Sequence, residues 1–211
     1  MADNSKSMAV VGVTGSGKSY FINQMINDIK RCPDAQMVLI DPKRVELIEY
    51  KNCANTLWYA SGEQEIDDAL RNTYDLMEMR FERMEEAGIK ASNEPDVYVF
   101  IDEMAFLMQS SQRKEYTTML SRIALMGRAA RIHIICCTQI ATQDVIPACI
   151  RDNLTNIVCL RQRDAGKYRY LLGSFPGRLP MYGYGYLLTP DMARPEKLKT
   201  EDIWDRIKGA A

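Results

Sequence analysis

Eight residues near the start of the chain, Gly12–Ser19, read GVTGSGKS and fit the pattern G-x-x-x-x-G-K-[ST]. Glycines let backbone N–H groups curl around phosphate oxygens, and a following helix offers its positive N-terminal end to the same anion. We therefore expect Lys18 on the β- and γ-phosphates of ATP and Ser19 on a Mg²⁺ ion. The residues predicted to contact the nucleotide are Gly12, Val13, Thr14, Gly15, Ser16, Gly17, Lys18, Ser19 and Tyr20.

A second carboxylate is needed for the metal, and the segment VYVFIDE supplies it with Asp102. The adjacent Glu103 is the candidate general base for an attacking water. A switch GTPase would carry an N-K-x-D guanine motif, which this sequence lacks, and small-molecule kinases usually lack the adjacent glutamate. The Asp-Glu pair therefore favours an ATPase that couples hydrolysis to motion. The other interpretation is that Glu103 only caps a helix or pairs with a lysine.

Two further polar residues extend this set. Gln139, which follows Thr138 at the end of the next apolar run, is a candidate sensor of the γ-phosphate or of the attacking water. Arg128 precedes that run, and an arginine there suits stabilisation of the transferred phosphoryl group in a neighbouring subunit. The residues alone leave an ordinary surface salt bridge equally open for Arg128.

These residues need a scaffold, and the apolar pattern predicts one of alternating strands and helices. Strands that are apolar throughout imply a parallel sheet buried on both faces, whose ligands bind at the C-terminal strand ends. The predicted strands are Met8–Val13, Ala35–Asp41, Asn55–Ala60, Asp96–Asp102, Arg131–Gln139, Thr155–Arg161 and Tyr184–Thr189. The predicted helices are Lys18–Arg31, a long helix opened by a Ser61–Gln64 capping box and ending at Ala87, Lys114–Ala130, Ala165–Leu172 and Thr200–Lys208.

Composition sets the outer limits of the interpretation. The chain has 211 residues with a net charge of −1, which fits one soluble domain and excludes a wholly basic protein that coats nucleic acid. Six cysteines without a Cys-x-x-Cys pair predict reduced, mostly buried thiols in a cytoplasmic protein. No apolar stretch approaches the ~18 residues of a membrane span.

Five segments, in their order and rough spacing, resemble the FtsK/SpoIIIE DNA translocase motor domain: GVTGSGKS, LIDPKRVEL, VFIDEMAFLM, GRAARIHIICCTQ and DVIPACIRDNLTNIVCLRQRD. The resemblance runs from about Met8 to Thr189. It implies a RecA-like P-loop NTPase core of the α/β class, with a mostly parallel sheet sandwiched by helices. It also implies a hexameric ring that pulls double-stranded DNA, with Arg128 acting on the neighbouring subunit. Asp41 and Lys43 match the family's D-P-K element and are expected near the active site or at a subunit contact.

The sequence also departs from the large chromosome translocases. The stretch between the second strand and VFIDE is shorter, and Arg131 stands where the family usually has glycine. We expect a single motor domain over residues 1–211, with an N-terminal tail at 1–7 and a C-terminal extension at 190–211. We expect no channel domain before this motor and no winged helix after it, and therefore a plasmid, conjugative-element or phage motor, or an excised domain. The alternatives are a protein-secretion ATPase, a viral genome-packaging ATPase and a module that binds ATP without turnover.

Contact with a DNA backbone requires local positive charge. The candidate segments are Gln109–Tyr116 and Arg151–Arg178, and an ordinary solvated surface is the alternative for each. Tyr182, Tyr184 and Tyr186 alternate with glycines, which fits a strand edge better than stacking on single-stranded bases; contact with the nucleotide base stays open.

Overall fold

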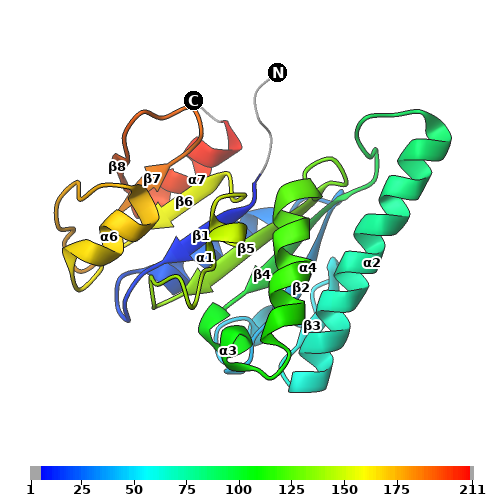
Figure 1. The fold of residues 1–211 in the computed structure, drawn as a ribbon, viewed down its shortest axis with the longest axis horizontal. Coiled ribbons are helices and arrows are strands. Elements are labelled where there is room, and N and C mark those ends of the chain that lie inside the picture. Colours follow the sequence, from blue (N-terminus) through cyan, green and yellow to red (C-terminus); the bar gives the residue numbers. More distant parts are fainter. Residues whose placement is uncertain (1–5, 210–211) are drawn as a thin grey trace.

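The computed structural model describes residues 6–209, which form an eight-stranded sheet with helices on both faces (Figure 1). The order of strands across the sheet is β3-β2-β4-β5-β1-β6-β7-β8. The first six in that order are parallel, and β7 and β8 join antiparallel. The strand bounds are β1 Met8–Val11, β2 Ala35–Ile40, β3 Thr56–Ala60, β4 Asp96–Ile101, β5 Ile132–Thr138, β6 Asn156–Cys159, β7 Tyr184–Leu188 and β8 Glu196–Lys199.

Successive side chains of the central strands enter two separate cores. In β1, Ala9 and Val11 belong to the core on one face of the sheet, whereas Met8 and Val10 belong to the core on the other. Because side chains alternate along a strand, a strand covered on both faces must be apolar at every position, as predicted. The edge strand β8 was not predicted, because three of the four residues in its sequence, EKLK, are charged and leave no apolar run.

The helices divide between the two faces. One core takes apolar side chains of α1, η1 and α7, and the other takes those of α2, α3, α4, α5 and α6. In α1, the buried residues recur with helical spacing, so that one stripe faces the sheet. The helix bounds are α1 Lys18–Ile29, η1 Ile48–Tyr50 (a 3-10 turn), α2 Glu63–Ala87, α3 Met104–Gln109, α4 Arg113–Met126, α5 Ala148–Arg151, α6 Ala165–Leu172 and α7 Thr200–Lys208.

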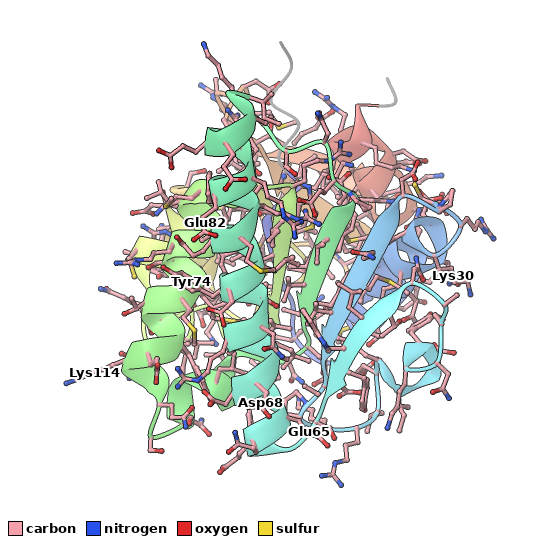
Figure 2. The ribbon with its side chains drawn as sticks, turned by 90° about the vertical axis from the view of Figure 1, so that its right-hand side faces the viewer. Lys30, Glu65, Asp68, Tyr74, Glu82 and Lys114 are labelled. Atoms are coloured by element: carbon pink, nitrogen blue, oxygen red, sulfur yellow. The ribbon has the colours of Figure 1, made fainter. Side chains whose placement is uncertain are left out.

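The long helix α2 lies across one face of the sheet with α4 beside it (Figure 2). Glu65, Asp68 and Glu82 are exposed on its outer side, while Leu70 and Met77 are buried. Two charged residues of the helix, Asp67 and Arg80, are buried as well. The predicted capping box is wrong by one residue. The helix begins after Gly62, and the Glu65 carboxylate accepts the N–H groups of Ser61 (2.9 Å) and Gly62 (3.0 Å).

The chain between β4 and β5 differs most from the prediction. A short helix, α3, precedes α4, and α4 ends at Met126 rather than Ala130. The turn after α4 closes with Arg131 in the left-handed region, at a φ of 57°. Glycine adopts that conformation without strain, which agrees with the glycine that the large chromosome translocases usually have where this chain has Arg131.

At the N-terminal end, the expected tail lies outside the described residues up to residue 5. Ser7 is buried, and its Oγ accepts the N–H of Ile134 (3.1 Å).

The six cysteines are free; Cys136, Cys137 and Cys159 are buried and the other three lie nearer the surface. Burial raises the pKa of Cys136 to about 12. Within residues 6–209, no helix combines the length and apolar character that a bilayer crossing requires.

Candidate functional site

The loop after β1 is held between the ends of its two neighbouring strands. The Gly12 N–H donates to the carbonyl of Thr138 (3.2 Å), which ends β5, and the Val13 N–H donates to the carbonyl of Arg161 (3.1 Å), beyond β6. A Cβ atom at Gly12 would stand 2.3 Å from the Ser16 Oγ atom, so only glycine fits there. The loop therefore has a fixed position at the C-terminal edge of the sheet.

Two glycines shape the rest of the loop. Gly15 (φ 79°) and Gly17 (φ 94°) both adopt left-handed backbone conformations. Gly17 is the N-cap of α1, and Lys18 is the first residue of that helix. The first N–H groups of an α-helix have no partner within the helix, so α1 presents free donors and a positive dipole end to this loop.

Lys18 and Asp102 form a buried ion pair. The Lys18 Nζ lies 2.9 Å from Oδ1 of Asp102, and the side chains are 10% and 4% exposed. The other carboxylate oxygen of Asp102, Oδ2, is buried and has no hydrogen-bond partner among residues 6–209. Burial raises the pKa of the Asp102 carboxyl, and the Lys18 ammonium opposes that rise. A buried carboxylate oxygen without a partner suits a hard cation such as Mg²⁺.

Both carboxylate oxygens of Glu103 are occupied. Oε2 lies 2.8 Å from the Lys43 ammonium, and Oε1 accepts a hydrogen bond from the Thr138 hydroxyl (2.7 Å). Burial alone would raise the pKa of Glu103, but these two bonds lower it below its ordinary value. Glu103 is also the N-cap residue of α3. Its side chain makes no capping hydrogen bond, so the structure contains the lysine partner of the alternative interpretation but not the side-chain cap.

A cavity of about 350 Å³ opens over the loop. Gln139 reaches it, and its Oε1 accepts the Thr14 hydroxyl (2.8 Å). Two of the predicted nucleotide contacts, Gly12 and Ser16, are buried and do not line the cavity. The candidate base Glu103 does not line it either. The lining residues are Val13, Thr14, Gly15, Gly17, Lys18, Ser19, Tyr20, Lys43, Glu46, Asp102, Gln139 and Tyr182.

Three lining residues had no assigned role in the sequence. Lys43 and Glu46 come from the turn after β2, and Tyr182 comes from the glycine-tyrosine stretch before β7. A second cavity, of about 450 Å³, shares Gly17, Tyr20 and Tyr182 with the first. Lys43 and Tyr182 stand in motifs that the sequence made conspicuous. Glu46 stands in the same segment, LIDPKRVEL, as Lys43.

Arg128 lies away from this cavity. It sits in the exposed turn that leads into the first residue of β5, whereas the phosphate loop lies at the other end of the parallel strands. A seven-residue strand spans roughly 20 Å, so Arg128 is not a part of its own chain's cavity. Its neighbour Arg131 pairs with Asp96 (2.9 Å) at that same N-terminal edge.

The two basic segments are partly engaged within the chain. Arg113, at the start of α4, donates to the carbonyl of Asp144 (3.3 Å). Lys114 beside it projects away from the molecule (Figure 2). In the second segment, Arg151 packs over the ring of Tyr170 (4.6 Å).

Comparison of the sequence with known proteins identifies the family. A model of the FtsK/SpoIIIE family matches residues 1–98 and 87–143 of this chain. The chain belongs to the FtsK/SpoIIIE family. Its sequence is 30% identical to the DNA translocase FtsK of Chlorobaculum tepidum over 217 residues. That alignment includes 91% of this chain but 27% of the translocase, so the chain spans about a quarter of the relative's length.

Solved structures show the same P-loop ATPase fold. The pCW3 conjugation coupling protein TcpA superposes with a TM-score of 0.79 at 20% identity, covering 100% of this chain and 66% of TcpA. The cytoplasmic domain of the type VII secretion ATPase EccC of Thermomonospora curvata gives a TM-score of 0.75 at 20% identity, covering 92% of this chain and 25% of EccC. The expected fold, a mostly parallel sheet between helices in an FtsK/SpoIIIE-type P-loop ATPase, is confirmed.

Proposed function

We propose that this chain is an ATP-hydrolysing motor domain that translocates double-stranded DNA. The observation that carries the proposal is the convergence of Lys18, Asp102 and Gln139 on one cavity, with Glu103 directly behind it, in a chain of the FtsK/SpoIIIE family. A lysine, a metal-binding carboxylate and a second carboxylate around a phosphate loop are the parts that hydrolysis of a nucleoside triphosphate needs.

The Lys18–Asp102 ion pair suits an exchange of partners on nucleotide binding. Phosphate oxygens take the Lys18 ammonium, and Asp102 is left to hold Mg²⁺ together with Ser19. The residues fit the ion, because Oδ2 of Asp102 is buried with no partner in the described part of the chain and the Ser19 hydroxyl lines the same cavity. When bound, the metal neutralises negative charge on the phosphates. Neither Lys18 nor Asp102 is left unpaired in either state.

Hydrolysis then needs a base and a positioned water. Glu103 accepts a proton from the water as the water oxygen bonds to the γ-phosphorus. The bond from that phosphorus to the β-phosphate oxygen breaks, and ADP and phosphate leave. Gln139, on the cavity wall, orients the water or contacts the γ-phosphate.

The nucleoside belongs in the second cavity. It adjoins the phosphate loop through Gly17 and Tyr20, and the exposed ring of Tyr182 faces both spaces. Aromatic rings stack on bases without reading their edges, so the Tyr182 ring would hold the base of the nucleotide in this cavity by stacking.

A neighbouring subunit completes the site. We assign Arg128 to the transition-state charge of an adjacent chain in a hexameric ring, since it cannot serve its own cavity and an arginine is well suited to that charge. Double-stranded DNA is the cargo, contacted through its phosphate backbone.

The test is ATP turnover with and without cargo. Mass photometry first establishes whether the wild-type preparation contains rings. Wild-type rings should hydrolyse ATP several-fold faster with long duplex DNA, and Lys18→Ala should abolish turnover. Lys51→Met, which alters an exposed lysine outside the cavity, is the matched control. Turnover that ignores duplex DNA but responds to a signal peptide would instead select a secretion ATPase.

A further inference from the structure

Lys43 projects from a turn whose ends are anchored. The turn follows β2 and begins at Asp41, a fully buried residue whose N–H donates to the carbonyl of Ala60 (2.9 Å). The Oδ2 atom of Asp41 accepts the N–H of Leu47 (2.9 Å), which closes the turn on itself. The backbone that carries Lys43 is therefore fixed, while its side chain is 44% exposed and free to change rotamer.

The ammonium of Lys43 holds the candidate base in place. It lies 2.8 Å from Oε2 of Glu103, whose side chain is 10% exposed. The other carboxylate oxygen is held by the Thr138 hydroxyl, and Thr138 Oγ1 in turn accepts the N–H of Ile140 (3.1 Å). That second bond directs the hydroxyl proton toward Glu103. In this arrangement both oxygens of Glu103 already accept a bond, and the carboxylate does not line the cavity in which the attacking water would lie.

Lys43 lines the cavity, whereas Glu103 does not. The space that Lys43 lines lies above the phosphate loop and is also bordered by Lys18 and Ser19. A bound triphosphate would place a terminal phosphate in that space, with more negative charge than a single carboxylate. Charge-assisted bonds to phosphate compete well with those to a carboxylate.

We propose that Lys43 is a positioning residue that exchanges Glu103 for the terminal phosphate of a bound triphosphate. One ammonium–carboxylate contact breaks and one ammonium–phosphate contact forms. Glu103 is then free to turn toward the water. A diphosphate lacks the attracting group, so with ADP the base stays held by Lys43 and Thr138. This inference rests on the proposed function, because it concerns the timing of hydrolysis at the same site.

The test compares two nucleotides by calorimetry, in the presence of Mg²⁺: the non-hydrolysable triphosphate analogue AMP-PNP and ADP. Lys43→Met should weaken AMP-PNP binding fivefold or more and leave ADP binding within twofold. Lys43→Arg, which keeps the charge, should retain most of the preference for AMP-PNP. Glu103→Gln should tighten AMP-PNP binding about threefold, because the ammonium loses its competing carboxylate.

A merely structural Lys43 would not change the ratio of the two affinities. Equal changes for both nucleotides in Lys43→Met, a loss in Lys43→Arg as large as in Lys43→Met, or no tightening in Glu103→Gln would each overturn the proposal. Wild-type protein that binds neither nucleotide would instead contradict the proposed function. Thermal melting of each variant verifies folding, and Lys51→Met is again the matched control.

Discussion

The ammonium of Lys18 and the carboxylate of Asp102 lie 2.9 Å apart at the C-terminal edge of the sheet, and both side chains are buried. Lys18 begins α1, and Asp102 follows β4, so the pair joins two segments that are separated by 84 residues in the sequence. Each charge satisfies the other in a place where an unpaired charge would be costly.

Removing one member of this pair should destabilise the fold. Lys18→Met leaves the Asp102 carboxylate buried without its cation, and breaking a buried pair in this way costs about 3 kcal/mol. We expect that loss in the free energy of unfolding at pH 7, measured by urea titration. The double variant Lys18→Met with Asp102→Asn should recover much of it. An unchanged stability in the single variant would show that the pair is not desolvated.

Arg131 provides a test of backbone strain. Its φ of 57° is unfavourable for any residue with a Cβ atom, and its side chain pairs with Asp96 (2.9 Å). Arg131→Gly and Arg131→Ala both remove the ion pair, but only the alanine variant keeps a Cβ. We expect Arg131→Gly to be about 1 kcal/mol more stable than Arg131→Ala in chemical denaturation. Equal stability of the two variants would contradict the strained conformation.

The ionised carboxylate of Asp96 should make the free energy of unfolding depend on pH in the acid range. Burial alone would raise the pKa of Asp96, but bonds from His133 and Arg131 and the nearby charge of Lys6 lower it well below its ordinary value. A carboxyl whose folded pKa is depressed stabilises the fold above its unfolded pKa of about 4 and loses that contribution as the pH falls below it.

Unfolding of the wild type and Asp96→Asn should therefore differ most at pH 5–7. The difference in free energy should shrink steadily from about pH 4 toward pH 2. A difference that stays constant over that range would show that the ionised form of Asp96 is not what stabilises the fold. Asp68→Asn, on the exposed outer side of α2, is the matched control (Figure 2).

We expect the base of the nucleotide to bind in the second cavity, against the ring of Tyr182. Tyr182→Ala removes an exposed aromatic ring that borders both cavities, and loss of base stacking costs about 1–3 kcal/mol. We expect ATP affinity to fall at least fivefold by calorimetry, with the affinity for inorganic tripolyphosphate unchanged. A loss that is equal for both ligands would place Tyr182 at the phosphates instead.

Much of the fold followed from local pattern. The ranges Ala165–Leu172 and Thr200–Lys208 match the predicted helices, and the apolar runs marked the central strands, because a strand buried on both faces leaves a continuous hydrophobic signal. The edge strand β8 and the short helix α3 were missed. Their residues are placed by tertiary contacts rather than by a periodic pattern of their own.

The site was less predictable than the fold. Lys18, Asp102 and Gln139 converge as expected, because parallel strands deliver their C-terminal ends to one edge. The partner of Glu103 was not predictable, because Lys43 lies 60 positions earlier in the sequence and no local pattern links the two residues. Arg128 belongs to the opposite edge, and its proposed role depends on a second chain.

We propose that ATP hydrolysis, with Glu103 as the general base, drives movement along duplex DNA. The most direct test of this proposal is displacement of a triplex-forming strand from long duplex DNA by wild-type rings and by Glu103→Gln rings, with ATP turnover followed in the same samples. We expect ATP-dependent displacement by the wild type. The Glu103→Gln rings should still bind ATP but show at least a hundredfold loss of turnover and no displacement. Wild-type rings that hydrolyse ATP without displacing the strand, or Glu103→Gln rings that keep turnover, would contradict it.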